Sequence, residues 1–295
     1  MEHGPPLGID DPSAGGDVAN DREAGGASDH VSFTRSLVAH PGLGPLRGLL
    51  LTLTVVTGVV DAVSILALGR VFVANMTGNV VFSAFAVVGA PGFSLSASLF
   101  ALAGFLVGAY AGGRLIARTA ADRGALLRAG AGAEFGLAAA VLLIAGLSGD
   151  PGVSHGTLQL GNGASGAFGA GVTDALAALL AAAMGVQNAV ARKLAVPDLT
   201  TTVLTMTLTG IGADIRAAFR GEGTTRAATR GDLDRRLLAV ATMVIGAAAG
   251  ASLTLRVSPL SALALAAALL ALAAVWVTLA TRRPAGWRSF PAQKR

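Results

Sequence analysis

The chain has 295 residues, of which 53% are hydrophobic and only 13% are charged, and its mean hydropathy is +0.65. An ordinary soluble domain carries about 25% charged residues, so this composition argues strongly against a soluble globular enzyme. The absence of cysteine excludes disulfides, iron–sulfur clusters and thiolate zinc sites. All four histidines lie outside the apolar segments, so we expect no metal site and no cofactor.

The N-terminal 34 residues differ in composition from the rest of the chain. Residues 1–34 contain seven acidic residues and one basic residue, and they are rich in glycine, serine and proline. Such a segment cannot bury enough apolar surface to offset its ordering entropy, so we expect a disordered acidic tail. The chain does not start with a basic region followed by an apolar one, so we expect no cleaved signal peptide.

Eight apolar segments follow in chain order. A bilayer span needs about 20 mostly apolar residues. By that standard six segments are long enough to cross, 72–88 is borderline, and the threonine-rich 199–213 is too short. The segments are 49–68, 72–88, 95–116, 129–147, 167–190, 199–213, 237–255 and 260–280.

The basic residues choose between two topologies. Arginine and lysine cluster before the first segment, between the third and fourth, after the fifth, between the sixth and seventh, and after the last. If all eight segments crossed, the basic loop between the third and fourth would lie outside, against the positive-inside rule. If 72–88 and 199–213 do not cross, every basic loop is cytoplasmic. The pattern therefore predicts six crossings, with both termini in the cytoplasm.

An internal repeat supports the same organisation. Gly58–Val63 resembles Gly185–Val190, the triplet at 77–79 lies opposite 205–207, and Gly108–Gly112 matches Gly246–Gly250. Chance similarity between alanine- and glycine-rich segments is the alternative, but the three matches are collinear. Three crossings in each half make the halves inverted relative to each other, as in many transporters.

The predicted fold is an all-α polytopic membrane protein, a 3+3 inverted-repeat helix bundle with two additional short, broken or re-entrant helices. The first repeat covers 35–148 and the second covers 167–282. We expect a glycine-rich external loop at 149–166 and a basic cytoplasmic tail at 283–295.

Two blocks carry a resemblance to a known family. The first is Gly58-Val-Val-Asp61-Ala-Val-Ser64, followed by Gly69-Arg-Val-Phe-Val-Ala-Asn75-Met-Thr-Gly-Asn79. The second comprises residues 185–189 and 196–205. Together they resemble the YoaK-type family of bacterial integral membrane proteins over roughly residues 45–282. The resemblance implies six transmembrane segments and no established biochemical function. Met206 departs from the family, which usually has glycine there, as at Gly78.

Asp61 is the leading candidate for chemistry. It lies about two-thirds along the first apolar segment, where an uncompensated charge is costly, and intramembrane acids commonly mark ion or proton paths. The alternative is an aspartate that only fixes helix packing. Its repeat counterpart is Asn188, preceded by Gln187, and this asymmetry suits one titratable site per molecule.

Two polar clusters accompany Asp61. Asn75, Thr77 and Asn79 begin the second segment, and helical spacing would put 75 and 79 on one face. The cluster either lines a polar cavity or caps an ordinary helix. In the sixth segment, a hydroxyl face is predicted. Its alternative is threonine back-bonding to helix carbonyls. The residues of that face are Thr202, Thr205 and Thr209.

Two other acids and five glycines complete the candidates. Glu134 is expected near the headgroups and Asp174 near the outer interface, and both rank below Asp61. The glycines form GxxxG motifs, which pack helices closely. We expect them to pack 95–116 against 237–255 or to make a homodimer face. They are Gly104, Gly108, Gly112, Gly246 and Gly250.

No enzyme motif occurs in a supporting context, so we expect no enzymatic activity. The leading hypothesis is a secondary transporter or channel for an unidentified small solute, proton-coupled through Asp61. The alternative is a non-transporting scaffold or partner-binding protein, whose polar motifs only fix helix packing. The expected location is the bacterial inner membrane, and the expected partners are the lipid bilayer, the solute and a second copy of the chain. We expect no nucleic-acid partner, because the basic residues lie in short loops.

Overall fold

The computed structural model describes residues 45–119, 122–149, 153–154, 157–158, 167–194, 207–212, 225–282 and 286–288. The fold is helical apart from a short antiparallel pair that the sequence did not predict, β1 (Val153–Ser154) and β2 (Thr157–Leu158). The predicted acidic tail at 1–34, most of the 149–166 loop, and both Thr202 and Thr205 lie outside the described residues.

Six described helices are long and apolar enough to cross a membrane, as the hydropathy pattern predicted. In α8 the apolar span is Leu233–Arg256. A seventh helix, α3 (Met76–Val87), has 12 residues and a length of about 18 Å, well short of a hydrocarbon core about 30 Å thick. The six are α2 (Leu46–Ala67), α4 (Leu95–Arg118), α5 (Arg123–Leu147), α6 (Ala170–Leu194), α8 (Thr225–Arg256) and α9 (Pro259–Ala280).

Polar capping residues determine where several helices begin. Ser94 accepts a hydrogen bond from the backbone N–H of Ala97 at the start of α4. Asp122 accepts two backbone N–H bonds at the start of α5, which therefore begins six residues before the predicted apolar segment. Ser258 followed by Pro259 starts α9. Side-chain acceptors satisfy N–H groups that a helix start leaves unpaired.

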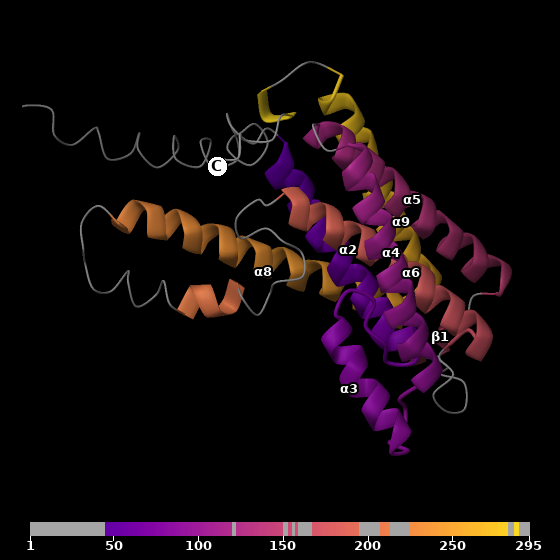
Figure 1. The fold of residues 1–295 in the computed structure, drawn as a ribbon. Coiled ribbons are helices and arrows are strands. Elements are labelled where there is room, and N and C mark those ends of the chain that lie inside the picture. The colour runs from indigo at the N-terminus through magenta and orange to yellow at the C-terminus, as the bar shows by residue number, and fades with distance from the viewer. Residues whose placement is uncertain are drawn as a thin grey trace, which may run out of the picture.

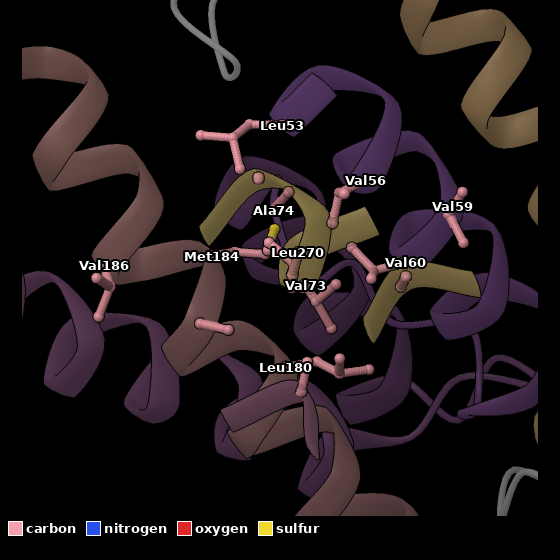
Figure 2. Close-up of a cluster of buried hydrophobic side chains, with 14 of the residues drawn as sticks. Leu53, Val56, Val59, Val60, Val73, Ala74, Leu180, Met184, Val186 and Leu270 are labelled. Carbon is pink, nitrogen blue, oxygen red and sulfur yellow. The ribbon is translucent and has the colours of Figure 1, made fainter. Parts of the chain in front are cut away.

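The spans form a bundle in which α5, α6, α2 and α9 contact one another in a closed series (Figure 1). The remaining two long helices pack on this core, α4 against α6 and α8 against α2. In Figure 1 the N-terminal part of α8 extends away from the other spans. The interior between α2, α6 and α9 is filled by apolar side chains, including those of Val60, Met184 and Leu270 (Figure 2).

The two ends of the bundle differ in charge. Gly124 near the start of α5 lies beside Thr281, just past the end of α9, and Gly130 lies beside Val190 near the end of α6. The end of α2 and the start of α4 lie beside the start of α6. One end of the bundle therefore gathers the starts of α2 and α5 and the ends of α4, α6 and α9. We call it the basic end, because it carries Arg118, Arg123, Arg128, Arg192, Lys193, Arg282 and Arg288. Only Arg70 and Arg256 lie at the opposite end among the described residues.

Both flanks of α3 lie at this opposite end. The carbonyl of Ala67, the last residue of α2, accepts a hydrogen bond of 2.8 Å from the N–H of Ala167, just before α6. In the first turn of α4, Ser96 donates to Asp174 near the start of α6. The chain thus leaves α2 and enters α4 at the same end, and α3 does not cross the bundle. This agrees with the prediction for 72–88, whereas only 207–212 of the segment 199–213 is described.

Glycines allow α4 and α6 to cross closely. A methyl group on Gly108 would meet the backbone of Ala182, and one on Gly112 would meet the side chain of Ala189 at 2.6 Å. Gly104 faces the backbone of α6 in the same way, one turn earlier. The residue numbers of the contacting pairs increase together along the two helices, so α4 and α6 run parallel.

The crossing of α2 with α8 is built alike. Gly246 lies against the backbone of Val55, and Gly250 lies against Val59 and Ala62. From the other side, a methyl group on Gly58 would meet the carbonyl oxygen of Met243 at 2.5 Å. Here too the residue numbers of the contacting pairs increase together, so α2 and α8 run parallel.

The contacts at the two crossings correspond position by position. Val55 and Ala182 are 127 positions apart, as are Ala62 and Ala189, while their glycine partners are 138 positions apart. These are the offsets of the sequence repeat. The expectation that 95–116 packs against 237–255 is nevertheless wrong, because the glycines of α4 face α6 and those of α8 face α2. The helix face that carries each set of glycines is therefore already covered by another helix of the same chain.

At the basic end, an ion pair joins the start of α5 to the segment after α9. Asp122, the capping residue of α5, pairs with Arg288 in the short 3₁₀ helix η1 (Gly286–Arg288) after α9. Arg288 also donates to the carbonyl of Thr281 at 3.2 Å. The hydrogen bond from Arg288, together with the backbone N–H groups of α5, holds the pKa of Asp122 below its usual value.

This ion pair predicts a pH dependence. A carboxyl group whose pKa is lowered by folding stabilises the native state above its unfolded pKa of about 3.9 and loses that effect as the pH falls through the folded value. We therefore expect Arg288→Gln to lower the melting temperature at pH 6, and the difference from the wild type to shrink below about pH 4. Thermal unfolding of both proteins in detergent between pH 3 and 7 measures this. A difference that is constant with pH would contradict the role of Asp122.

Candidate functional site

A non-helical segment between α2 and α3 enters the bundle. Gly69 and Arg70 adopt left-handed backbone conformations, with φ of 77° and 56°, and turn the chain back after α2. The segment that follows has no regular structure, yet Val71 and Val73 are fully buried. Figure 2 shows Val73 and Ala74 among side chains of α2, α6 and α9. Backbone at this depth needs internal hydrogen-bond partners.

Asp61 supplies two of these partners. Its Oδ1 accepts hydrogen bonds from the backbone N–H groups of Val73 at 3.3 Å and Ala74 at 3.1 Å. Only 9% of Asp61 is exposed. The aspartate that the sequence singled out therefore anchors the non-helical segment to α2, which the sequence did not reveal.

Asn79 holds the same segment from α3. It donates to the carbonyl of Phe72 at 2.6 Å and accepts from the N–H of Phe72 at 2.8 Å. The ring of Phe72 occupies the space that a side chain at Gly78 would need, and it stacks on Phe82 with ring centroids 5.5 Å apart. Asn79 is fully buried, so its amide is used entirely inside the protein. We call residues 71–75, with the Asp61 and Asn79 side chains that hold them, the clamped segment.

The other two residues of this motif do not share its interior. Asn75 and Thr77 are exposed, and Asn75 makes no side-chain capping bond to α3. The expectation that residues 75 and 79 lie on one helical face is wrong, because Asn75 precedes α3 with extended backbone. The motif is thus divided between one buried anchor and two outward-facing side chains.

One turn from Asp61, a polar contact joins the first repeat to the second. Gln187 of α6 donates to the hydroxyl of Thr57 at 2.8 Å, and Thr57 lies four residues before Asp61 on the same face of α2. Gln187 is 1% exposed, and its Oε1 has no hydrogen-bond partner in the described part of the chain. Thr57 was not among the predicted residues, although its position on the face of Asp61 could have identified it.

The repeat counterpart of Asp61 is used differently. Asn188 donates to the carbonyl of Met184, one turn earlier in α6, at 2.8 Å. In the helical turn at 207–212, Thr207 is buried and Thr209 is exposed, so the described part of the predicted hydroxyl face lies outside the interior. The structure therefore joins Asp61 and Asn79 through residues 72–74, and it places Gln187 against Thr57, one turn before Asp61 on α2. The hydrogen bond of Asn188 is made within α6, and Thr209 is exposed.

Glu134 is not where the sequence placed it. It was expected near the headgroups, but it is 1% exposed and its Oε2 has no partner within the described residues. The distance from Arg128 along the chain was misleading, because α5 runs from Arg123 to Leu147, which places Glu134 about halfway along the helix. Asp174, in contrast, accepts a bond from the exposed Ser96 near the opposite end of the bundle, as its predicted interfacial position requires.

Comparison with known proteins gives one match. Residues 49–276 match the family described as Protein of unknown function (DUF1275). No curated protein and no solved structure matches the chain significantly. The matched range begins in α2 and ends in α9, so it includes four candidate spans and most of the other two, together with both glycine crossings and the clamped segment. The chain is a multi-pass helical membrane protein by length and hydropathy, and it belongs to the DUF1275 family of proteins of unknown function.

Proposed function

We propose that the protein is a transporter or channel for a small solute in the bacterial inner membrane, with a YoaK-type 3+3 inverted repeat and both termini in the cytoplasm. The observation that carries the proposal is the clamped segment. Non-helical backbone within a bundle is a feature of transporters, whose broken helices lie near the substrate site. Here that backbone is held by the intramembrane acid Asp61.

Two further observations support this proposal. The equivalent glycine crossings, α4 with α6 and α2 with α8, are what an inverted repeat requires, since exchanging the halves exchanges the crossings. Near the clamped segment, Gln187 connects the halves through Thr57, and its buried Oε1 has no hydrogen-bond partner among the described residues. A buried polar atom without a partner is costly, and sites that bind polar solutes are one reason for keeping it.

A specific observation favours a second candidate function, a non-transporting scaffold. The two buried motif side chains, Asp61 and Asn79, are hydrogen-bonded to the protein's own backbone. In the scaffold, their role ends with holding the clamped segment in place. The two functions differ in whether changing Asp61 alters solute movement in a protein that remains folded.

The topology can be tested with single cysteines, because the chain contains none. Cysteines at positions 120 and 225 should be protected from a membrane-impermeant thiol reagent added to whole spheroplasts, and a cysteine at 155 should be labelled. The positive-inside rule gives this orientation, since the basic end then faces the cytoplasm. Labelling at 120 or 225 with none at 155 would reject the proposed topology.

Transport can be tested in proteoliposomes with an imposed pH gradient and a panel of small solutes. We expect at least one solute to move, and Asp61→Asn to remove the pH dependence of its flux. Asp174→Asn is the matched control, because it removes an acid whose hydrogen bond is to Ser96 of α4 and not to the clamped segment. If both variants lose the pH dependence of flux equally, Asp61 has no specific coupling role. If no solute moves, the result favours the scaffold.

A further inference from the structure

A surface groove lies between α5 and α9, apart from the clamped segment. It has a volume of about 460 Å³ and is almost entirely apolar. Phe135 lines it from α5, and Ala271, Ala274 and Thr278 line it from α9, with Arg282 at one end. Val275 and Leu279 also line it from α9, and the small side chains of Ala271 and Ala274 leave space beside Phe135.

The length of the groove matches one leaflet of a bilayer. Ala271 to Arg282 covers eleven residue steps, or about 16 Å along a helix. Half of a hydrocarbon core about 30 Å thick is about 15 Å. The groove therefore runs from the middle of the membrane to its surface at the basic end, which is the depth that one acyl chain occupies.

Positive charge lies where the groove reaches that surface. Arg282 is exposed and directly follows Thr281, whose hydroxyl accepts a bond from the guanidinium of Arg128 at 3.3 Å. Arg128 is also exposed, and it lies seven residues before Phe135 on the same face of α5. Two cations thus flank the polar end of an apolar groove, an arrangement that complements a phosphate group attached to an acyl chain.

We propose that this groove is a binding site for an anionic glycerophospholipid of the leaflet at the basic end. One acyl chain lies along Ala271, Ala274 and Thr278 against Phe135, and the phosphate lies at Arg282 and Arg128. The lipid joins α5 and α9 on the outside of the bundle, so its binding stabilises the contact between the two halves. The inference does not depend on whether the protein transports a solute.

Thermal unfolding of the full-length protein in detergent tests the site. We expect phosphatidylglycerol to raise the melting temperature in a saturable way, with a smaller effect for phosphatidylcholine and none for inorganic phosphate. Removing one cation near a membrane surface should weaken binding of the anionic lipid, so Arg282→Gln should raise the midpoint of the phosphatidylglycerol titration about fivefold. The control is Arg256→Gln, which removes an exposed arginine at the opposite end of the bundle and should leave the midpoint unchanged.

A second variant tests the apolar part. Ala274→Leu fills the middle of the groove while keeping all charges, and it should reduce the saturable shift produced by phosphatidylglycerol. Equal titration midpoints for Arg282→Gln and Arg256→Gln would overturn the proposal, because they would indicate nonspecific electrostatic attraction of the lipid rather than binding in the groove. An equal response to phosphatidylcholine and phosphatidylglycerol in the wild type would also overturn it. If Ala274→Leu does not fold, the comparison of the two arginine variants still decides.

Discussion

Gly108→Ala should lower the free energy of unfolding by about 1–3 kcal/mol, the usual cost of adding a methyl group to a tightly packed interface. The added methyl would meet the backbone of Ala182, and backbone cannot move aside as a flexible side chain can. The two helices would have to separate along the whole crossing, with loss of the van der Waals contacts that hold membrane helices together.

Two comparisons make this measurement decisive. Gly113→Ala adds the same methyl group to α4, where nothing lies within 4 Å, and should cost no stability. Gly246→Ala should resemble Gly108→Ala, since its methyl would meet the backbone of Val55 at the equivalent crossing. Chemical unfolding in detergent gives all three values. Equal stability of Gly108→Ala and Gly113→Ala would show that the α4–α6 contact is looser than the structure indicates.

The sequence predicted the spans well because a bilayer imposes one simple requirement, about 20 apolar residues for each crossing. It predicted their ends poorly. The start of α5 depends on the capping by Asp122, and α8 begins at Thr225, well before its apolar part. Charged helical turns outside the apolar core satisfy their backbone within the helix, so hydropathy does not detect them.

The glycine motifs identified close packing but not its partners. GxxxG requires only that the opposing surface allow close approach. The opposing residues here, Ala182 on α6 and Val55 on α2, have no distinctive pattern. The offsets of the internal repeat contained the information that the two crossings are equivalent, but they did not show which helix each one pairs with.

The clamped segment shows a similar limit. Asp61 and Asn79 stood out as polar residues in apolar surroundings, but both of them bind backbone groups of residues 72–74. Backbone groups have no sequence signature, and the segment does not follow the helical spacing used to place Asn75. Polar residues in a membrane segment can therefore be identified from sequence, whereas what they bind depends on where the chain leaves its helix.

Asp61→Ala should therefore destabilise the protein strongly. It leaves the buried N–H groups of Val73 and Ala74 without an acceptor, and each such group costs about 1–3 kcal/mol. The total expected loss is about 2–6 kcal/mol, and the clamped segment should leave the bundle before the helices unfold. Reactivity of a cysteine introduced at Val73 toward a thiol reagent measures that local opening.

Asp61→Asn separates the acceptor from the charge. An asparagine keeps one side-chain oxygen, which can take over both backbone bonds, and it removes the cost of burying a charge. Its stability and the reactivity of the cysteine at position 73 should stay close to those of the parent protein. If Asp61→Asn is as destabilised as Asp61→Ala, the negative charge itself holds the segment. A stable Asp61→Asn that still loses pH-dependent flux would assign Asp61 two roles: its oxygen holds the clamped segment, and its proton couples to the solute.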